Sequence, residues 1–123
     1  MRMNLKDCYE GFGGDFDSVM GRLRREQLVT KFLYKFLEDK SFELFETSME
    51  QQNYEEALRA VHTLKGICQN LSFTQLYESS RQITNALKEG DPGKAAELAP
   101  QLSQDYGRII HAVQAYQSAA EEP

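Results

Sequence analysis

The sequence predicts an all-α protein: an up-down four-helix bundle with short N-terminal covering helices. Proline occurs only at positions 92, 100 and 123, so the first 91 residues lack the strongest helix breaker. Apolar side chains recur at helical three- and four-residue spacing, and no segment alternates apolar and polar residues as a strand does. The connections between the long amphipathic segments are short, which forces neighbouring helices to run antiparallel.

The first helices are predicted to be short and separated by glycines. A segment from about Asn4 to Phe12 ends at the glycine-rich residues 11–14. Asp15 then stands where it can cap a helix that runs to about Leu23.

A longer helix follows, interrupted by a polar break at residues 39–41. Its wide apolar stripe consists of Leu28, Val29, Phe32, Leu33, Phe36 and Leu37. Beyond the break the pattern continues on a helix to about Gln51, with Phe42, Phe45 and Met49 on its apolar face.

Three more helices are predicted from their capping signals. Asn53 with Glu56 approximates a capping box and opens a helix to about Leu71. A second box, Ser72 with Gln75, opens the next helix, which ends near Gly90 and has Leu76, Ser80, Ile83 and Leu87 on one face. Asp91 as cap and Pro92 as first residue start the last helix. Its apolar series is Ala95, Leu98, Leu102, Tyr106, Ile109, Val113 and Tyr116, and Pro100 should bend it.

The composition supports one acidic domain over residues 1–123, with N-terminal helical segments over about 1–23 and the bundle over about 24–118. The 14 basic and 19 acidic side chains give a formal net charge of −5, which argues against a nucleic-acid partner. No apolar run approaches the ~18 residues of a membrane span, and the first seven residues lack the apolar stretch of a signal peptide. We therefore expect a cytoplasmic protein without a membrane partner. A bundle that uses its apolar stripe internally needs no second copy, so we expect a monomer.

The two cysteines predict reduced thiols rather than a metal site. Cys8 and Cys68 lie sixty positions apart, and neither belongs to a C-x-x-C motif. This spacing suits neither a zinc site nor a disulfide framework. We expect no bound metal, and Cys68 is interpreted as a small buried apolar residue.

One face of the helix at residues 54–71 is unusual. Successive residues step by about 100° around a helix axis. The core side of this helix then holds Ala57, Ala60, Val61, Leu64, Ile67, Cys68 and Leu71. His62 points the opposite way, with Lys65 about 60° to one side, Gly66 about 40° to the other and Gln69 about 20° away.

Gly66 and Lys65 both suggest that this face meets another molecule. A mid-helix glycine costs ~1 kcal/mol relative to alanine, and here there is no core for it to crowd. It is explicable if another backbone must approach the helix closely. A neutral imidazole is a nitrogen nucleophile, and a lysine one turn away can neutralise an anionic group attached to it. The plain alternative is an ordinary exposed histidine beside a solvated lysine.

The residues 61–66, Val-His-Thr-Leu-Lys-Gly, resemble the H-x-x-K-G core of histidine-containing phosphotransfer (HPt) domains. Asn70-Leu71 and the Leu-Lys-Glu-Gly-Asp at 87–91 add to the resemblance, as do the Gly-Gly-Asp at 13–15 and the paired Phe-Leu steps at 32–33 and 36–37. The resemblance covers about residues 13–113. It implies a four-helix bundle that accepts a phosphoryl group from a receiver-domain aspartate and passes it to another receiver.

The resemblance also implies roles for individual residues. His62 would be the phosphorylated residue, Lys65 the stabiliser of phosphoryl charge and Gly66 the clearance for the incoming receiver. From their place on the helix we also expect Leu58 and Gln69, which share the histidine's face, and Arg59, one turn before it, to bind the partner. The resemblance adds Thr84 of the following helix. Thr84 stands where the family often has a polar residue that supports the site. Arg81 could add positive potential nearby.

The implied chemistry needs no cofactor on this chain. It has no G-x-x-x-x-G-K loop, so it should be a phosphocarrier without ATP-dependent kinase activity. The magnesium ion of the transfer would belong to the receiver, whether of a response regulator or of a hybrid sensor kinase.

Two other interpretations remain beside this one. A dimeric sensor-kinase phosphoacceptor would carry an acidic residue, Leu, Arg and a Thr-Pro step after the histidine, but here Thr63-Leu64-Lys65-Gly66 follows. A non-phosphorylated helical adaptor would use Leu58 and the N-terminal aromatic residues as a groove. His111, the second histidine, is interpreted as an ordinary surface or boundary residue.

Overall fold

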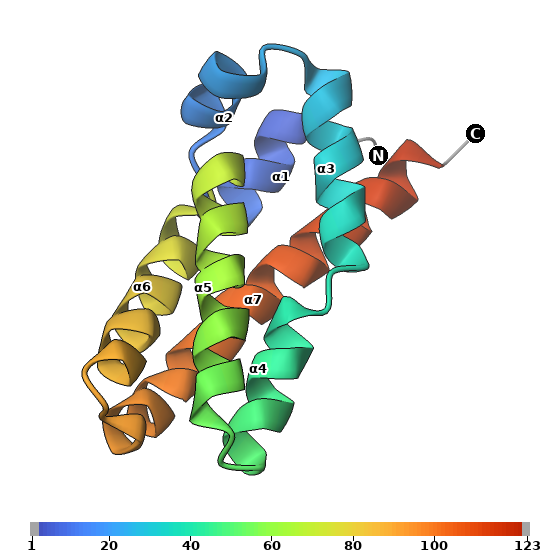
Figure 1. Cartoon of the computed structure of the whole chain (residues 1–123). Coiled ribbons are helices and arrows are strands. Elements are labelled where there is room, and N and C mark those ends of the chain that lie inside the picture. Colours follow the sequence, from blue (N-terminus) through green and yellow to red (C-terminus); the bar gives the residue numbers. More distant parts are fainter. Residues whose placement is uncertain (1–2, 122–123) are drawn as a thin grey trace.

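The computed structural model describes residues 3–121, and this part of the chain is helical with no strand. Figure 1 shows its seven helices. Their bounds are α1 Leu5–Gly11, α2 Phe16–Leu23, α3 Glu26–Leu37, α4 Ser41–Glu50, α5 Tyr54–Leu71, α6 Thr74–Lys88 and α7 Pro92–Ala120. The predicted all-α fold is confirmed. Residues 1, 2, 122 and 123, which the predicted domain includes, lie outside the described residues.

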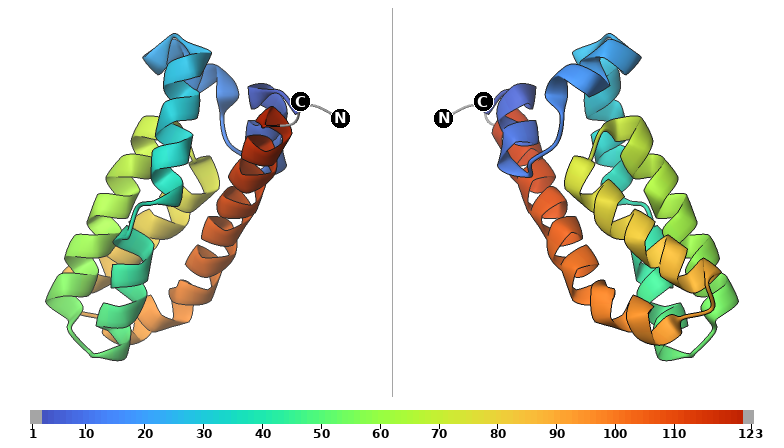
Figure 2. Two further views of the ribbon diagram at one scale, coloured as in Figure 1. Left: turned by 90° about the vertical axis from the view of Figure 1, so that its right-hand side faces the viewer. Right: turned by 90° about the vertical axis from the view of Figure 1, so that its left-hand side faces the viewer.

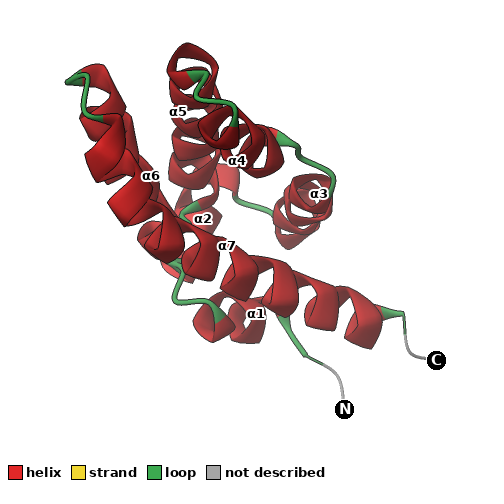
Figure 3. Ribbon diagram, turned by 90° about the horizontal axis from the view of Figure 1, so that it is seen from below, coloured by secondary structure: helices red, strands yellow, loops and turns green. Residues whose placement is uncertain are grey.

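The bundle has four arms, and the first of them is broken in two. Helix α4 packs along α5, α5 along α6 and α6 along α7, each neighbour running antiparallel to the last. Helix α3 continues the arm of α4 beyond the polar break at residues 39–40. The view along the bundle in Figure 3 shows α7 crossing the side opposite α5, with α1 beside it.

The two N-terminal helices cover one end of the bundle. Helix α1 packs mainly on α7, where the Cys8 thiol donates to the Ala112 carbonyl at 3.6 Å. An aromatic cluster fills the space beneath it, with Phe73 edge-on to Phe12 at 5.2 Å and to Phe36 at 5.0 Å between ring centroids. These rings are almost completely buried, so α1 and α2 are part of one continuous core with the bundle.

Short-range capping signals gave correct helix starts. The side chains of Asp15, Asn53 and Asp91 each accept the backbone N–H three residues further on, at 2.9, 3.3 and 3.0 Å. Pro92 occupies the first helical position, as predicted. Pro100 lies inside α7, and Figure 2 shows this helix changing direction in its orange, N-terminal part.

The prediction that Ser72 opens the sixth helix is wrong. Ser72 instead ends α5 in the left-handed region, at φ 57°, and α6 begins at Thr74 without a side-chain cap. Long-range contacts fix this conformation, because the Ser72 carbonyl accepts the Asp15 N–H at 3.0 Å and its hydroxyl donates to Ser18 at 3.0 Å. The serine therefore joins α2 to the end of α5 rather than capping its own helix.

No helix within residues 3–121 has both the length and the apolar character needed to traverse a bilayer.

Candidate functional site

The bundle holds α5 so that one side is buried and the other faces solvent. The buried side chains are those of Ala57, Ala60, Val61, Leu64, Cys68 and Leu71. This agrees with the predicted core stripe except at Ile67, which is half-buried and lines a groove with Phe32 and Leu71. The expectation that Ile67 belongs to the core was therefore only partly right, because α3 covers this side of α5 loosely.

His62 lies in the middle of the solvent-facing side of α5 and is exposed, as predicted. Lys65, one turn further on, is half-buried. Among residues 3–121, neither side chain takes part in a hydrogen bond or an ion pair. The imidazole and the ammonium group are thus both available to a ligand.

Gly66 stands beside His62 in open space. A Cβ atom built at this position would have no heavy atom within 4 Å, apart from its own helix and chain neighbours. The packing of this chain therefore gives no reason for a glycine, although it weakens the middle of an 18-residue helix. What the glycine leaves is a flat strip of helix backbone next to the imidazole.

The residues around this strip differ in how accessible they are. Leu58 is half-buried and packs against the core, whereas Gln69 is exposed. Arg59 is exposed but forms an ion pair with Glu56, with 3.3 Å between Nη1 and Oε2. All three border the face of His62, as their positions in the sequence predict.

The inclusion of Thr84 among the partner-binding residues is wrong. Thr84 is fully buried, and its hydroxyl donates to the Ser80 carbonyl at 2.7 Å. It cannot touch a partner, because α6 turns this side into the core. The buried side of α6 consists of Leu76, Ser79, Ser80, Ile83, Thr84, Ala86 and Leu87.

Arg81 contributes little free charge to the site. Its guanidinium donates to both oxygens of Glu78, with the Nε–Oε2 distance at 3.0 Å. This hydrogen-bonded contact lowers the pKa of the Glu78 carboxyl to about 2. The positive charge of Arg81 is thus neutralised by the carboxylate of Glu78 on the surface of α6.

The structure adds one basic residue that the sequence did not place near the site. Arg22 of α2 donates to the Asn70 carbonyl at 2.8 Å and to the Ser72 hydroxyl at 3.0 Å. Together with Gln69 and Tyr77 it lines a shallow pocket at the C-terminal end of α5. No local signal could have revealed this, because Arg22 is 48 residues away from Asn70.

Charge along the chain sets the α5 face apart. Residues 57–77 form the longest stretch without aspartate or glutamate in a chain that has 19 of them. After Glu56 in the first turn, the exposed face of α5 therefore carries basic side chains and no carboxylate. Such a face favours the approach of an anionic group.

A family model described as the Hpt domain matches residues 27–118, about three quarters of the chain. The chain belongs to the Hpt domain family. Comparisons with curated proteins and with solved structures gave no match. Hpt domains are phosphocarriers that act in histidine phosphotransfer with receiver domains of two-component systems, and they are not kinases. In this Hpt domain the matched segment spans the whole bundle, while α1 and α2 precede it.

Proposed function

We propose that His62 accepts a phosphoryl group from the phosphoaspartate of one receiver domain and passes it to the aspartate of another. The observation that carries this proposal is the exposed His62 next to Gly66, whose missing side chain serves no packing purpose within the chain. The membership of the chain in the Hpt family supports it independently.

The chemistry requires only a nucleophile and a way to hold charge. An imidazole nitrogen of His62 attacks phosphorus, the bond between phosphorus and the aspartyl oxygen breaks, and the receiver keeps the free carboxylate. The imidazole N–H proton is lost to solvent, and the reverse reaction transfers the phosphoryl group onward. Transfer of this kind depends on positioning and electrostatics more than on covalent machinery.

Lys65 would contribute the electrostatic stabilisation, and Gly66 would contribute to the positioning of the receiver. The Lys65 ammonium, one turn from His62, would neutralise the equatorial phosphoryl oxygens as they cross. Gly66 would let the receiver's loop approach the helix backbone. Leu58 and Gln69 would contact the receiver on either side, with Arg59 and Arg22 at the edges of the same surface.

We assign the magnesium ion of the reaction to the receiver. Such an ion would offset phosphoryl charge from the donor side, whereas this chain would supply Lys65. The proposal places the reaction in the cytoplasm, where buried thiols such as Cys8 and Cys68 stay reduced.

Transfer can be tested with receiver domains phosphorylated on their aspartate by acetyl phosphate. Trypsin cleaves after Arg59, Lys65 and Arg108, so His62 falls on peptide 60–65 and His111 on peptide 109–123. Mass spectrometry at neutral to alkaline pH, where phosphohistidine survives, then reports each histidine separately. We expect an acid-labile phosphate on peptide 60–65 that is absent from His62→Gln.

The same experiment separates the proposal from its main alternative. A receiver that binds the chain tightly while peptide 60–65 stays unmodified would indicate a non-phosphorylated adaptor. Circular dichroism of His62→Gln should match that of the unchanged protein, because an exposed side chain contributes little to folding.

A further inference from the structure

The second histidine repeats the pattern of the first in the opposite chain direction. From His62 forwards, a lysine follows at three residues, a glycine at four and a glutamine at seven. From His111 backwards, Arg108 stands at three residues, Gly107 at four and Gln104 at seven. The pattern H-x-x-(K/R)-G-x-x-Q therefore occurs once on α5 and once, inverted, on α7.

Inversion of the sequence preserves the relative positions of the Cα atoms on the surface of a helix. Each residue of a helix is rotated by about 100° around the axis and shifted by about 1.5 Å along it. Arg108 therefore lies about 60° around the axis and about 4.5 Å along it from His111. Lys65 lies at the same angle and distance from His62, but in the opposite direction in both. A change of both signs is a rotation by half a turn about the axis that points out of the helix. After this rotation the Cα positions of the four residues on α7 match those on α5, while the side chains of the two helices tilt in opposite directions, each toward its own N-terminus. A protein that fits over α5 can therefore meet the same four residue types on α7 after turning around.

The four residues on α7 are accessible. His111, Arg108, Gly107 and Gln104 are all exposed. A Cβ atom at Gly107 would have no neighbour within 4 Å, as at Gly66, so packing does not explain this mid-helix glycine either. Neither Gly66 nor Gly107 is required by packing within the chain, and at both positions a close approach of another protein would explain the glycine.

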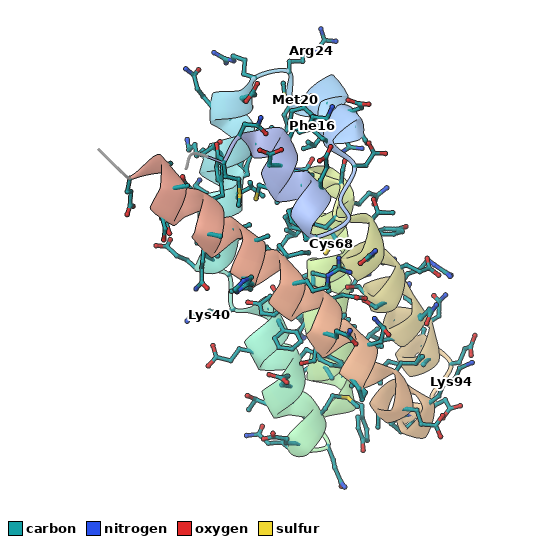
Figure 4. All side chains as sticks on the ribbon, turned by 180° about the vertical axis from the view of Figure 1, so that it is seen from behind. Phe16, Met20, Arg24, Lys40, Cys68 and Lys94 are labelled. Carbon is teal, nitrogen blue, oxygen red and sulfur yellow. The ribbon has the colours of Figure 1, made fainter. Side chains whose placement is uncertain are left out.

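The two surfaces open on opposite sides of the bundle. Helix α5 lies in front of α7 in Figure 1, and the side views of Figure 2 place them at opposite edges. Seen from behind in Figure 4, α7 crosses the front of the molecule with its outer side chains in solvent. A partner on one helix would leave the other open.

The charge pattern also repeats. Residues 106–120 form the second-longest stretch of the chain without aspartate or glutamate, after residues 57–77. Within residues 100–120 the charged side chains are Asp105, which is buried, and Arg108, which is exposed. Between residues 100 and 120 the outer face of α7 therefore carries one exposed charge, that of Arg108, with Glu78 of α6 lining the same pocket as Arg108. A cation at this position suits an acidic phosphorylated partner.

One contact distinguishes the two surfaces. Arg108 donates to the Gln75 side chain at 2.7 Å, across the seam between α6 and α7, whereas Lys65 has no such bond among the described residues. A phosphoryl group on His111 would have to draw Arg108 away from Gln75. We therefore expect the α7 surface to be used less than the α5 surface.

We propose that Gln104, Gly107, Arg108 and His111 form a second receiver-docking surface at which His111 accepts a phosphoryl group, an inference that rests on the function proposed for His62. An imidazole nitrogen of His111 forms the N–P bond, the receiver's aspartyl O–P bond breaks to release its carboxylate, and the imidazole N–H proton goes to solvent. Two receivers could then be engaged at once, one on each side of the bundle.

The test maps both histidines in the whole chain with a panel of receiver domains phosphorylated by acetyl phosphate. We expect phosphate on peptide 109–123 at lower occupancy than on peptide 60–65. It should persist in His62→Gln and disappear in His111→Gln. Gly107→Leu should lower it about tenfold by blocking a docked partner, a loss of the size that a single poor contact causes. Gly21→Leu is the matched control, because Gly21 is also an exposed helical glycine in open space.

Each outcome decides between the two proposals. Phosphate on peptide 60–65 without any on peptide 109–123 overturns the second surface and leaves His62 as the acceptor. If the phosphate on peptide 109–123 is the same in Gly107→Leu, His111 is labelled without a docked receiver. This outcome also overturns the second surface. Phosphate on His111 alone supports the second surface and overturns the role of His62. Failure of every receiver in the panel to label either peptide overturns both.

Discussion

The Tyr9 hydroxyl donates a hydrogen bond to the backbone carbonyl of Leu71 at 2.8 Å. Leu71 is the last residue of α5, and carbonyl groups in the last turn of a helix have no partner within the helix. Both residues are buried, so water cannot replace the bond. A side chain from α1, which precedes the family match, thus completes the C-terminal end of the helix that carries His62.

Removing this hydroxyl should destabilise the protein. Tyr9→Phe leaves the ring packing intact but strands a buried carbonyl, which lowers the free energy of unfolding by about 1–3 kcal/mol. Urea denaturation measures the loss. Tyr54→Phe is the control, because Tyr54 is 36% exposed and its change should have almost no effect. Equal stabilities of the two variants would contradict the role of the Tyr9 bond.

Filling the strip beside His62 should separate stability from function. Gly66→Leu replaces a poor helix former by a good one in open space, so the free energy of unfolding should rise by about 0.5–1 kcal/mol. The new side chain blocks the approach of a receiver, so the phosphate on peptide 60–65 should fall about tenfold or more. Gly21→Leu should leave this phosphate unchanged. A Gly66→Leu protein that is labelled normally would show that the strip is not a docking surface.

Removing the Lys65 charge should slow transfer without unfolding the protein. A charge-assisted contact to phosphoryl oxygens is worth about 1.5–3 kcal/mol, so Lys65→Ala should lower the rate of His62 labelling by about tenfold or more. Lys65→Arg keeps the charge and should restore part of the rate. Lys88→Ala, an exposed lysine at the end of α6, is the control. Rates are measured by quenching the reaction in alkali, and an unchanged rate in Lys65→Ala would remove this residue from the site.

Those features of the fold that depend on neighbouring residues could be predicted from the sequence. The caps at Asp15, Asn53 and Asp91 bind an N–H three positions away, so the local sequence contains the whole interaction. Ser72 carries the same kind of signal, yet its partners are Ser18 and the Asp15 N–H, more than fifty residues earlier. Nothing in the local sequence distinguishes these cases, because tertiary contacts override a cap that is worth about 1 kcal/mol.

In the candidate site, too, the residues whose placement depends on local helix geometry could be predicted, and those that depend on long-range contacts could not. His62 and Gly66 could be placed on the outer face because α5 is long and regular, so a fixed angular step holds along it. The family resemblance suggests a polar residue at Thr84, whereas the apolar stripe of α6, on which Thr84 lies, buries its side chain. The approach of Arg22 to Asn70 depends on how α2 folds back, which periodicity cannot reveal.

Alkaline pH should unfold the protein through its buried thiols. Burial raises the pKa of the Cys8 thiol from 9.0 to about 12, and burial also raises the pKa of Cys68. A raised pKa favours the protonated thiol in the folded state, so the stability is intact below about pH 9 and is lost as pH rises toward 12. At pH 10 the Cys8 thiol alone should account for a loss of about 1 kcal/mol relative to pH 7.

The variant Cys8→Ala tests this origin of the pH dependence. It lowers the stability at every pH, because it removes a buried side chain, but its stability should fall less between pH 7 and pH 10 than that of the unchanged protein. Urea denaturation at the two pH values gives both differences. Native protein at pH 8 should also fail to react with a thiol reagent, whereas unfolded protein should expose both thiols. Equal pH dependence in the two proteins would mean that other groups, such as the buried Tyr9 hydroxyl with its raised pKa, govern alkaline unfolding.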